Sequence, residues 1–271
     1  MTTGRSKQDF SYAKSYDSRL RQWVIRSVEG LSGRNTLQRL YRELHEEQPP
    51  TWEACGRALQ KLNIQLHFDE RQVGKFPKEG PVVFVANHPF GVVDGLILCH
   101  IISRVRRDFF LLINEVMAHE PLVDGHLLPI DFRPGRAALQ TNLHTRKEAA
   151  DRLGRGEVLA IFPSGAVATA SRWLGPAEEM PWRRFVAALI QRSRCAVVPL
   201  YFHGQNSRLF QWVSQVSMDL RLGLLLHEVL NKRGQTLRVE IGDPIPYAAL
   251  TPYRNRQELI DFLRGRTLAL R

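Results

Sequence analysis

The sequence predicts an α/β fold: a mostly parallel central sheet covered by helices on both faces, with a helical annex at the N-terminus. From residue 80 onward, short apolar runs alternate with helical stretches, an order typical of parallel strands joined by helices. The first 45 residues have no runs rich in Val and Ile, and they carry nine basic against four acidic side chains. We therefore expect a basic amphipathic annex over residues 1–50 and an α/β domain over residues 51–271.

Two amphipathic helices are expected in the annex, with a break at residues 32–34. Apolar side chains recur at helical spacing on one face of each helix. They are Leu20, Trp23, Val24, Val28 and Leu31 in the first helix, and Leu37, Leu40, Tyr41 and Leu44 in the second. Such stripes are typical of helices that pack on a domain. Alternatively, the Trp23 face or its Arg rim contacts lipid, where each basic residue near an anionic leaflet contributes about 1 kcal/mol.

Six strands are expected in the sheet, each from a short apolar run: residues 81–86, 109–114, 127–130, 157–162, 196–202 and 237–241. Helices are expected over residues 95–105, 136–153 and 181–193. In the second of these helices, Leu139, Leu143, Ala150 and Leu153 lie on one side. A terminal helix is expected over residues 251–271, opened by a Thr-Pro pair. In sheets of this kind the chemistry lies in loops after the carboxyl ends of strands.

The charge points to an anionic partner. The chain has 38 basic and 27 acidic residues among 271, a formal net charge of +11, and 31 of the basic residues are Arg. The planar guanidinium of Arg binds phosphate or carboxylate at two points. Nucleic acid, an anionic membrane surface and phosphorylated small molecules all fit this charge, and Arg richness is also a mark of a GC-rich genome.

Several classes of protein are excluded. Hydrophobic residues make up 44% and charged residues 24% of the chain, which excludes wholesale disorder. No uncharged apolar stretch reaches the ~18 residues of a spanning helix, and the N-terminal residues lack the apolar segment of a secretory signal, so we expect a cytoplasmic protein. Cys55, Cys99 and Cys195 are odd in number and far apart, which fits neither a disulfide framework nor a metal site.

The end of the first predicted strand carries a candidate catalytic pair. The strand runs into Asn87 and His88, Pro89 and Gly91 turn the chain, and Asp94 lies where the next helix begins. This order can bring a carboxylate back to an imidazole, which leaves the other ring nitrogen free to take a proton from a hydroxyl. The alternative is a strand-end His bonded to the backbone and an Asp that caps the helix.

Three further strand ends carry candidate binding groups. One enters the turn Phe162-Pro163-Ser164-Gly165, which presents backbone amides or the Ser164 hydroxyl to a ligand, unless Ser164 only caps the next helix. Another places Arg133 and Arg136 at an expected helix N-terminus, where they favour a phosphate or carboxylate, with a solvated basic turn as the alternative. The third ends in Val198-Pro199 and Gly204.

Together, these four strand ends resemble a known family. The order Asn87-His88…Asp94, Leu128-Pro129-Ile130-Asp131, Phe162-Pro163-Ser164-Gly165 and Val198-Pro199…Gly204 is similar to the four sequence blocks of the glycerolipid (lysophosphatidic-acid) acyltransferases. The resemblance covers about residues 80–205. In detail, residues 88–95 and 202–207 resemble the bacterial branch called haemolysin-like or lyso-ornithine-lipid acyltransferases.

The resemblance implies transfer of a fatty acyl chain from acyl carrier protein (ACP) or coenzyme A (CoA) to the free hydroxyl of a lysolipid, with no other cofactor and no metal. It implies that His88 is the general base, that Asp94 holds its ring, and that the hydroxyl attacks the thioester directly. Asn87 and the amides of Ser164 and Gly165 are the expected donors to the tetrahedral oxyanion.

The resemblance also implies how substrate and membrane are bound. Arg133 and Arg136 are expected to hold the acidic head group, beside Phe162 and Pro163 in the substrate site, although the usual second-block Arg aligns nearer Phe132. The implied place of action is the anionic cytoplasmic face of the inner membrane, with no nucleic-acid partner.

Two departures from the family pattern matter. The family usually has four residues between His and Asp, whereas five separate His88 from Asp94, so the turn must bulge to keep the pair in contact. The third block usually carries Glu between Pro and Gly, and Ser164 stands there instead. A shorter, neutral side chain changes how a head group is held, so an amino-acid lysolipid such as lyso-ornithine lipid competes with lysophosphatidic acid as acceptor.

Two other function classes are weighed against this one. A serine lipid hydrolase would use Ser164 as nucleophile, but the Gly-x-Ser-x-Gly elbow is lacking. A non-catalytic lipid- or nucleic-acid-binding protein would use the basic surface, but the sequence has neither paired Cys and His at zinc spacing nor an RNP-like aromatic strand. A dinucleotide site is excluded because Gly154-x-Gly156 precedes a strand instead of following one.

Overall fold

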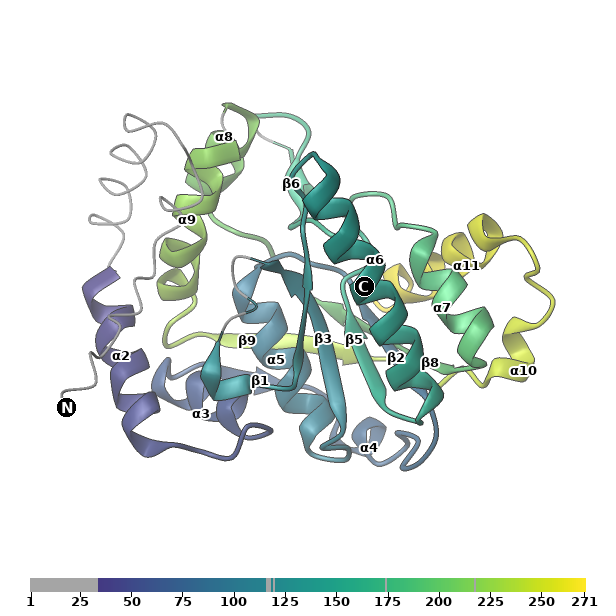
Figure 1. The fold of residues 1–271 in the computed structure, drawn as a ribbon. Helices are drawn as coiled ribbons and strands as arrows, with labels where there is room; N and C mark the ends of the chain where they lie inside the picture. Colours follow the sequence, from purple (N-terminus) through teal and green to yellow (C-terminus); the bar gives the residue numbers. More distant parts are fainter. Residues whose placement is uncertain (1–33, 116–117, 119, 174, 217) are drawn as a thin grey trace.

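A seven-stranded sheet forms the centre of the molecule (Figure 1). The computed structural model describes residues 34–271 except 116–117, 119, 174 and 217. In spatial order the strands are β1 (Gln65–His67), β9 (Thr236–Ile241), β8 (Ala196–Phe202), β2 (Val82–Ala86), β5 (Val158–Ile161), β3 (Phe109–Asn114) and β4 (Leu127–Ile130). Neighbouring strands are parallel except β8 and β9, so β1 and β9 run against the other five.

Helices cover both faces of this sheet, as predicted. On one face α6 (Arg136–Gly154), α7 (Phe185–Ser193) and α11 (Arg256–Leu268) pack together, and on the other lie α3 (Ala54–Lys61) and α5 (Val92–Ser103) (Figure 1). The remaining helical segments are α2 (Arg34–Glu47), α4 (Glu70–Val73), η3 (Pro121–Val123), α8 (Arg208–Val216), α9 (Met218–Asn231) and α10 (Tyr247–Leu250), and a small hairpin joins β6 (Thr169–Ala170) to β7 (Ala177–Glu178).

Strand β2 shows how the sequence builds two cores. All five of its residues are buried, because a central parallel strand has helices above and below it. Phe84 points into the core shared with α3 and α5, while Val83 and Val85 point into the core shared with α6, α7 and α11. The continuous apolar run that predicts this strand is therefore the signature of a strand buried on both sides.

All six predicted strands are present, and three predicted helices need correction. Helix α5 begins at Val92, ahead of the predicted residue 95, and α7 begins at Phe185 instead of residue 181. The terminal helix was predicted to open at Thr251, but it begins at Arg256, because the Asn255 side chain accepts from the Gln257 amide at 2.7 Å and so caps it there.

The apolar stripe predicted along α6 is divided between core and solvent. Ala150 and Leu153 are buried, whereas Leu139 and Leu143 are 58% and 54% exposed. The first turns of α6 follow the carboxyl end of β4, where the sheet stops, so Leu139 and Leu143 extend beyond the core. The four residues share one side of the helix, as predicted, but only the second half of that side is buried.

The described part of the annex packs on the domain. Leu44 of α2 is buried, Leu37 and Leu40 pack against the core, and the Tyr41 hydroxyl lies 3.0 Å from a carboxylate oxygen of Glu120. Burial and the Glu120 charge raise the pKa of Tyr41. The predicted break at residues 32–34 and the Trp23 stripe before it lie outside the described residues, apart from Arg34 at the start of α2.

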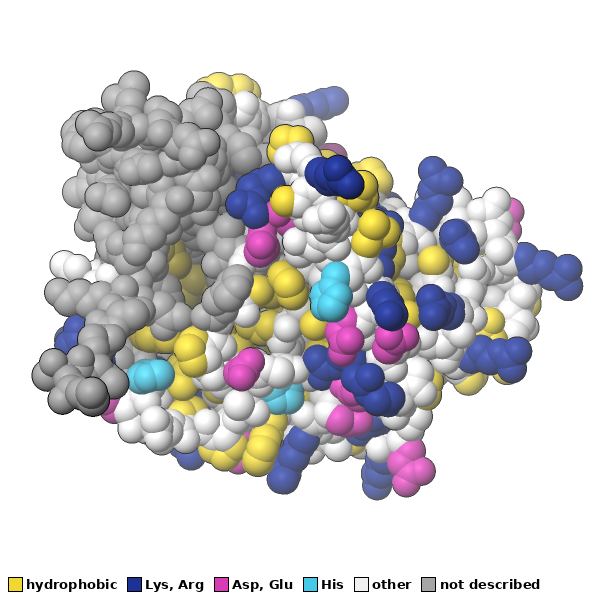
Figure 2. All heavy atoms as spheres, viewed as in Figure 1, with side chains coloured by type: hydrophobic (Ala, Val, Ile, Leu, Met, Phe, Trp, Pro, Cys, Tyr) yellow, Lys and Arg dark blue, Asp and Glu magenta, His cyan; other side chains and the backbone are white. Residues whose placement is uncertain are grey.

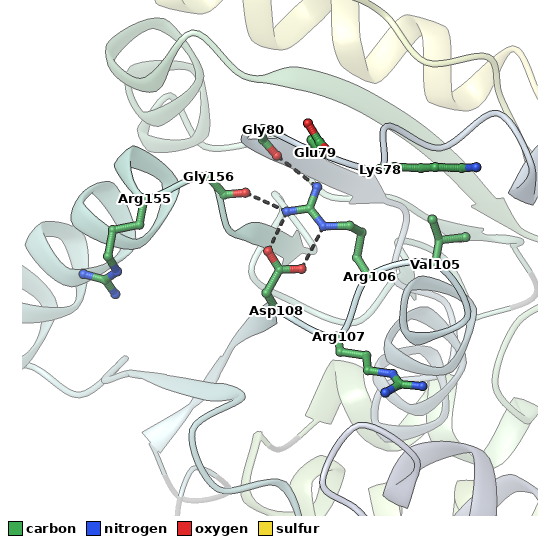
Figure 3. Close-up of a pocket in the computed structure, with 9 residues that line it drawn as sticks. All are labelled: Lys78, Glu79, Gly80, Val105, Arg106, Arg107, Asp108, Arg155 and Gly156. Atoms are coloured by element: carbon green, nitrogen blue, oxygen red, sulfur yellow. Dashed lines mark hydrogen bonds and ion pairs between the residues drawn. The ribbon is translucent and has the colours of Figure 1, made fainter.

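The amino-terminal edge of the sheet is closed by an Arg clamp (Figure 3). A hollow of about 540 Å³ lies there, beside the residues that precede β2, β3 and β5. The buried Arg106 guanidinium donates to Asp108 at 2.7 Å and to the carbonyls of Gly80 and Gly156 at 3.1 and 2.7 Å. Because the Arg106 donors all bond to groups of the protein, this side chain holds the starts of the strands together. The hollow lies at the edge of the sheet opposite to the carboxyl ends, where a catalytic site is expected.

Candidate active site

His88 and Asp94 form a hydrogen-bonded pair at the carboxyl end of β2. The His88 Nδ1 atom lies 2.9 Å from Asp94 Oδ2, with the His88 side chain 16% exposed and Asp94 fully buried. The same carboxylate oxygen accepts the backbone N–H of Phe90 at 2.8 Å and of Gly91 at 2.9 Å. Three contacts therefore fix the carboxylate. Within the described residues His88 Nε2 makes no hydrogen bond, which leaves it available for a proton.

The turn between the two residues bulges, as the five-residue spacing requires. Gly91 takes a φ of +87°, a conformation that side-chain-bearing residues rarely adopt. A Cβ at this position would lie only 3.0 Å from the Leu225 side chain. The longer turn therefore still allows the His–Asp contact. It needs glycine at position 91 because of the positive φ and because helix α9 leaves no room for a side chain.

The third-block turn packs directly against the imidazole. The Phe162 ring stacks on the His88 ring with centroids 4.0 Å apart and planes 13° apart. Ser164 is buried and donates its hydroxyl to the Ala166 carbonyl at 3.0 Å, while the Gly165 amide donates to the Phe162 carbonyl at 2.9 Å. Two amides were predicted to face an oxyanion. The Gly165 amide is used in this hydrogen bond within the turn, whereas the Ser164 amide is not.

Asn87 joins the ends of two strands. Its buried side-chain amide donates to the Phe202 carbonyl at 3.0 Å and accepts from the Phe202 amide at 2.7 Å. This reciprocal pair ties the end of β2 to the end of β8 and so brings the first and fourth sequence blocks together. Gly204, just beyond, has a φ of +118°, and a Cβ there would lie 2.8 Å from the Phe90 ring. The predicted role of Asn87 as an oxyanion donor stays a prediction.

The two Arg residues of the second block differ in their surroundings. Arg133 is exposed but donates to Asp131 at 2.9 and 2.7 Å and also pairs with Glu115. Hydrogen bonds from Arg133 lower the pKa of Asp131 to about 2. Arg136 lies exposed at the start of α6. Two carboxylates thus engage the charge of Arg133, a pairing that its position in the sequence does not predict.

Two residues that lie at this site could not be predicted from the sequence. Glu179, after β7, accepts the backbone N–H of His88 at 3.0 Å. Arg183 donates its amide to the Pro163 carbonyl at 3.0 Å, and its exposed side chain borders Gly165, as does the Phe132 ring. Both residues lie far from His88 in sequence, in a segment without strand or helix periodicity, so only the folded chain reveals them.

The part of the chain that the structure describes was compared with two other kinds of site, a metal centre and a membrane span. Among the described residues, His, Cys, Asp and Glu do not form a group that could hold a metal ion. The helices that the structure describes are all too short or too polar to cross a bilayer. The chemistry that the geometry supports is proton abstraction by His88 in a turn lined by backbone amides and basic side chains.

The fold and the His–Asp pair define an α/β enzyme of the acyltransferase type, and comparisons with known proteins agree. A family model described as Acyltransferase matches residues 11–271. The chain therefore belongs to the acyltransferase family, and it is an acyltransferase, as its four sequence blocks predict. The hydrolase and non-catalytic alternatives are set aside.

Two curated relatives and one solved structure carry the comparison further. Lyso-glycine lipid O-acyltransferases from Phocaeicola vulgatus and Bacteroides thetaiotaomicron are each 25% identical to the chain; the first match covers 69% of this chain and 67% of the relative, the second 74% of both. The crystal structure of the 1-acyl-sn-glycerophosphate (LPA) acyltransferase PlsC from Thermotoga maritima superposes with a TM-score of 0.52 at 12% identity, covering 95% of this chain and 83% of that one. This superposition confirms the predicted fold.

Proposed function

We propose that the chain is an O-acyltransferase that moves a fatty acyl chain from acyl-ACP or acyl-CoA to the free hydroxyl of a lysolipid by general-base catalysis. The observation that carries this proposal is the 2.9 Å contact between His88 Nδ1 and the buried Asp94, which leaves Nε2 as a proton acceptor. A base placed in this way contributes about 10²–10⁴-fold to a rate.

The reaction follows from the positions of these groups. Asp94 holds the proton on Nδ1, so Nε2 takes the proton of the lysolipid hydroxyl as its oxygen attacks the thioester carbonyl. A C–O bond forms, the tetrahedral oxyanion collapses, and the C–S bond breaks. The departing sulfur takes the proton back from His88 and leaves as a thiol. The buried Ser164 hydroxyl is bonded to a backbone carbonyl, which supports direct transfer over an acyl-enzyme.

The acceptor that we propose is an amino-acid lysolipid. Both curated relatives act on lyso-glycine lipid. The third block carries the neutral Ser164, and the exposed Arg183 borders Gly165, where a head-group carboxylate would pair with it; the exposed Arg136, at the start of α6, is a second candidate. Lysophosphatidic acid is the alternative acceptor.

An acylation assay tests the proposed function. Purified chain is incubated with acyl-ACP or acyl-CoA and with lyso-glycine lipid, lyso-ornithine lipid or lysophosphatidic acid, and products are identified by mass spectrometry. We expect the amino-acid lysolipids to gain one acyl chain with release of one thiol. Acylation of lysophosphatidic acid alone would contradict the acceptor, and no acylation of any lysolipid with either donor would contradict the function.

An anionic membrane surface is the proposed place of action, at the cytoplasmic face where both thioester donors are made. The large hydrophobic side chains that are exposed in the described part of the chain all follow the carboxyl ends of β4, β5 and β8, the edge that holds His88. They are Phe132, Leu139, Leu143, Trp173, Met180, Leu209 and Trp212. Figure 2 shows hydrophobic and basic side chains next to each other over the upper end of α6.

Two tryptophans of this edge lie close together. The rings of Trp173 and Trp212 lie 6.1 Å apart, and Trp212 Nε1 donates to the Trp173 carbonyl at 2.7 Å. Exposed Arg172 precedes Trp173 directly, and exposed Arg208 lies one helical turn before Trp212 in α8. Amphipathic rings next to cations suit the boundary between lipid head groups and acyl chains. We infer no nucleic-acid partner.

Charge reversal at this edge should weaken membrane binding. The double change Arg172→Glu and Arg208→Glu is expected to lower affinity for phosphatidylglycerol-containing vesicles by roughly 10–100-fold, because each basic residue near an anionic surface contributes about 1 kcal/mol. Vesicle co-sedimentation at low and high salt measures it, and salt should shrink the difference. The matched control, Lys78→Glu with Arg107→Glu at the opposite edge, should bind nearly as the wild type does; equal losses in both variants would contradict the orientation.

A further inference from the structure

We infer that Glu179 is a positioning residue for the general base: its carboxylate holds the backbone of His88 and faces the imidazole with a second negative charge. This inference rests on the proposed function, in which His88 becomes an imidazolium during transfer. Glu179 belongs to no sequence block of the family, and it reaches the site from the segment that follows β7.

The contacts of Glu179 lock its carboxylate in place. One oxygen accepts the His88 N–H at 3.0 Å and the other accepts the indole N–H of Trp182 at 3.1 Å. Its main-chain carbonyl accepts from an Arg264 guanidinium nitrogen at 3.1 Å. The Glu179 carboxylate is thus bonded to His88, while the Glu179 main chain is bonded to α11. On the other side of His88, the Ala168 amide donates to the His88 carbonyl at 2.7 Å, so this residue is held from both directions.

A half-buried carboxylate without a cation is costly, which makes this one informative. Burial raises the pKa of Glu179, while hydrogen bonds from the His88 amide and Trp182, together with the His88 charge, lower it. In the described part of the chain no Lys or Arg side chain forms an ion pair with this carboxylate. The cation that it faces is the one that forms when His88 takes a proton, a state that two flanking carboxylates stabilise together.

The other charges near the imidazole are accounted for. Asp94, from α5, contacts Nδ1, and Lys232, at the end of α9, is near enough to Asp94 for their charges to interact. Arg264, from α11, lies behind Glu179 and bonds to its carbonyl. The Ser164 hydroxyl lies beside the Glu179 carboxylate and helps to lower its pKa. Glu179 is therefore the group whose charge can be removed without breaking the His88–Asp94 bond.

The variant Glu179→Gln tests this inference, because it keeps the size and an oxygen that can accept the His88 N–H while it removes the charge. We expect kcat to fall about 10–100-fold with KM nearly unchanged, and the acidic limb of the kcat/KM profile to move to lower pH. NMR titration of the His88 ring should show the same displacement without any substrate. The melting temperature should fall slightly, because the Gln amide nitrogen replaces the oxygen that accepts the Trp182 N–H. The matched control is Glu178→Gln at the exposed neighbour, which should leave all four measurements unchanged.

A second variant, Trp182→Phe, frees one carboxylate oxygen and should lower kcat in the same direction, to a smaller extent. A merely structural Glu179 would lower the melting temperature of Glu179→Gln but leave its pH profile and its His88 titration in place. That result, or wild-type kcat in Glu179→Gln, would overturn the inference. Because the ring titration needs no turnover, it decides the positioning role even if the assays with lysolipids fail, so the two failures are distinguishable.

Discussion

Replacing His88 with Ala is expected to lower kcat/KM for acyl transfer by about 10³-fold, because the hydroxyl then has no acceptor for its proton. The fold should tolerate the change, since the His88 side chain is partly exposed and its ring hydrogen bonds to Asp94 alone among the described residues. Steady-state kinetics and thermal unfolding measure the two effects. His144→Ala, on the exposed surface of α6, serves as the matched control and should keep full activity. Near wild-type turnover by the His88 variant would remove the general base from the mechanism.

The change Asp94→Ala should lower both rate and stability. Its carboxylate oxygen accepts from the His88 ring and from two backbone N–H groups, and a buried donor left without an acceptor costs about 1–3 kcal/mol, so the free energy of unfolding should fall by about 2–4 kcal/mol. The rate should fall about 10²–10⁴-fold because no carboxylate then fixes the tautomer and the orientation of the His88 ring. From the sequence, helix capping by Asp94 is only the alternative to the catalytic pair, whereas in the structure the same carboxylate does both.

Asp94→Asn separates the two effects. The amide keeps an oxygen for the backbone donors, so urea unfolding should show a smaller loss than Asp94→Ala, while the rate stays low because the negative charge is gone. The control is Asp124→Asn, an exposed Asp whose side chain accepts from the following amide. Equal stability losses in Asp94→Ala and Asp94→Asn would show that the carboxylate charge, and not its place as an acceptor, holds the turn.

The central strands could be predicted because burial on both faces makes an apolar run unambiguous. Strand β1 could not: it is three residues long, sits at the edge of the sheet, and has one half-buried residue, Leu66, between two exposed ones. The two-residue strands of the hairpin β6–β7 carry no period at all. The antiparallel placement of β9 depends on a return of the chain through α8 and α9, which was not predicted.

Some residues of the candidate site could be predicted from the sequence, and others could not. His88 and Asp94 could be paired from the sequence because a single turn joins them. The partners of Asn87 and Arg133 could not be inferred, since backbone groups and carboxylates leave no motif of their own. Glu179 is 91 residues from His88, and only the route of the chain after β7 brings them into contact.

The reciprocal amide pair between Asn87 and Phe202 makes the catalytic loop depend on a strand that carries none of its reacting groups. The position at which β8 ends therefore fixes the position at which β2 ends, and with it how far the His88 ring extends into the site. Substitutions after Phe202 can therefore change activity by moving the imidazole, while every group that contacts the substrate keeps its identity.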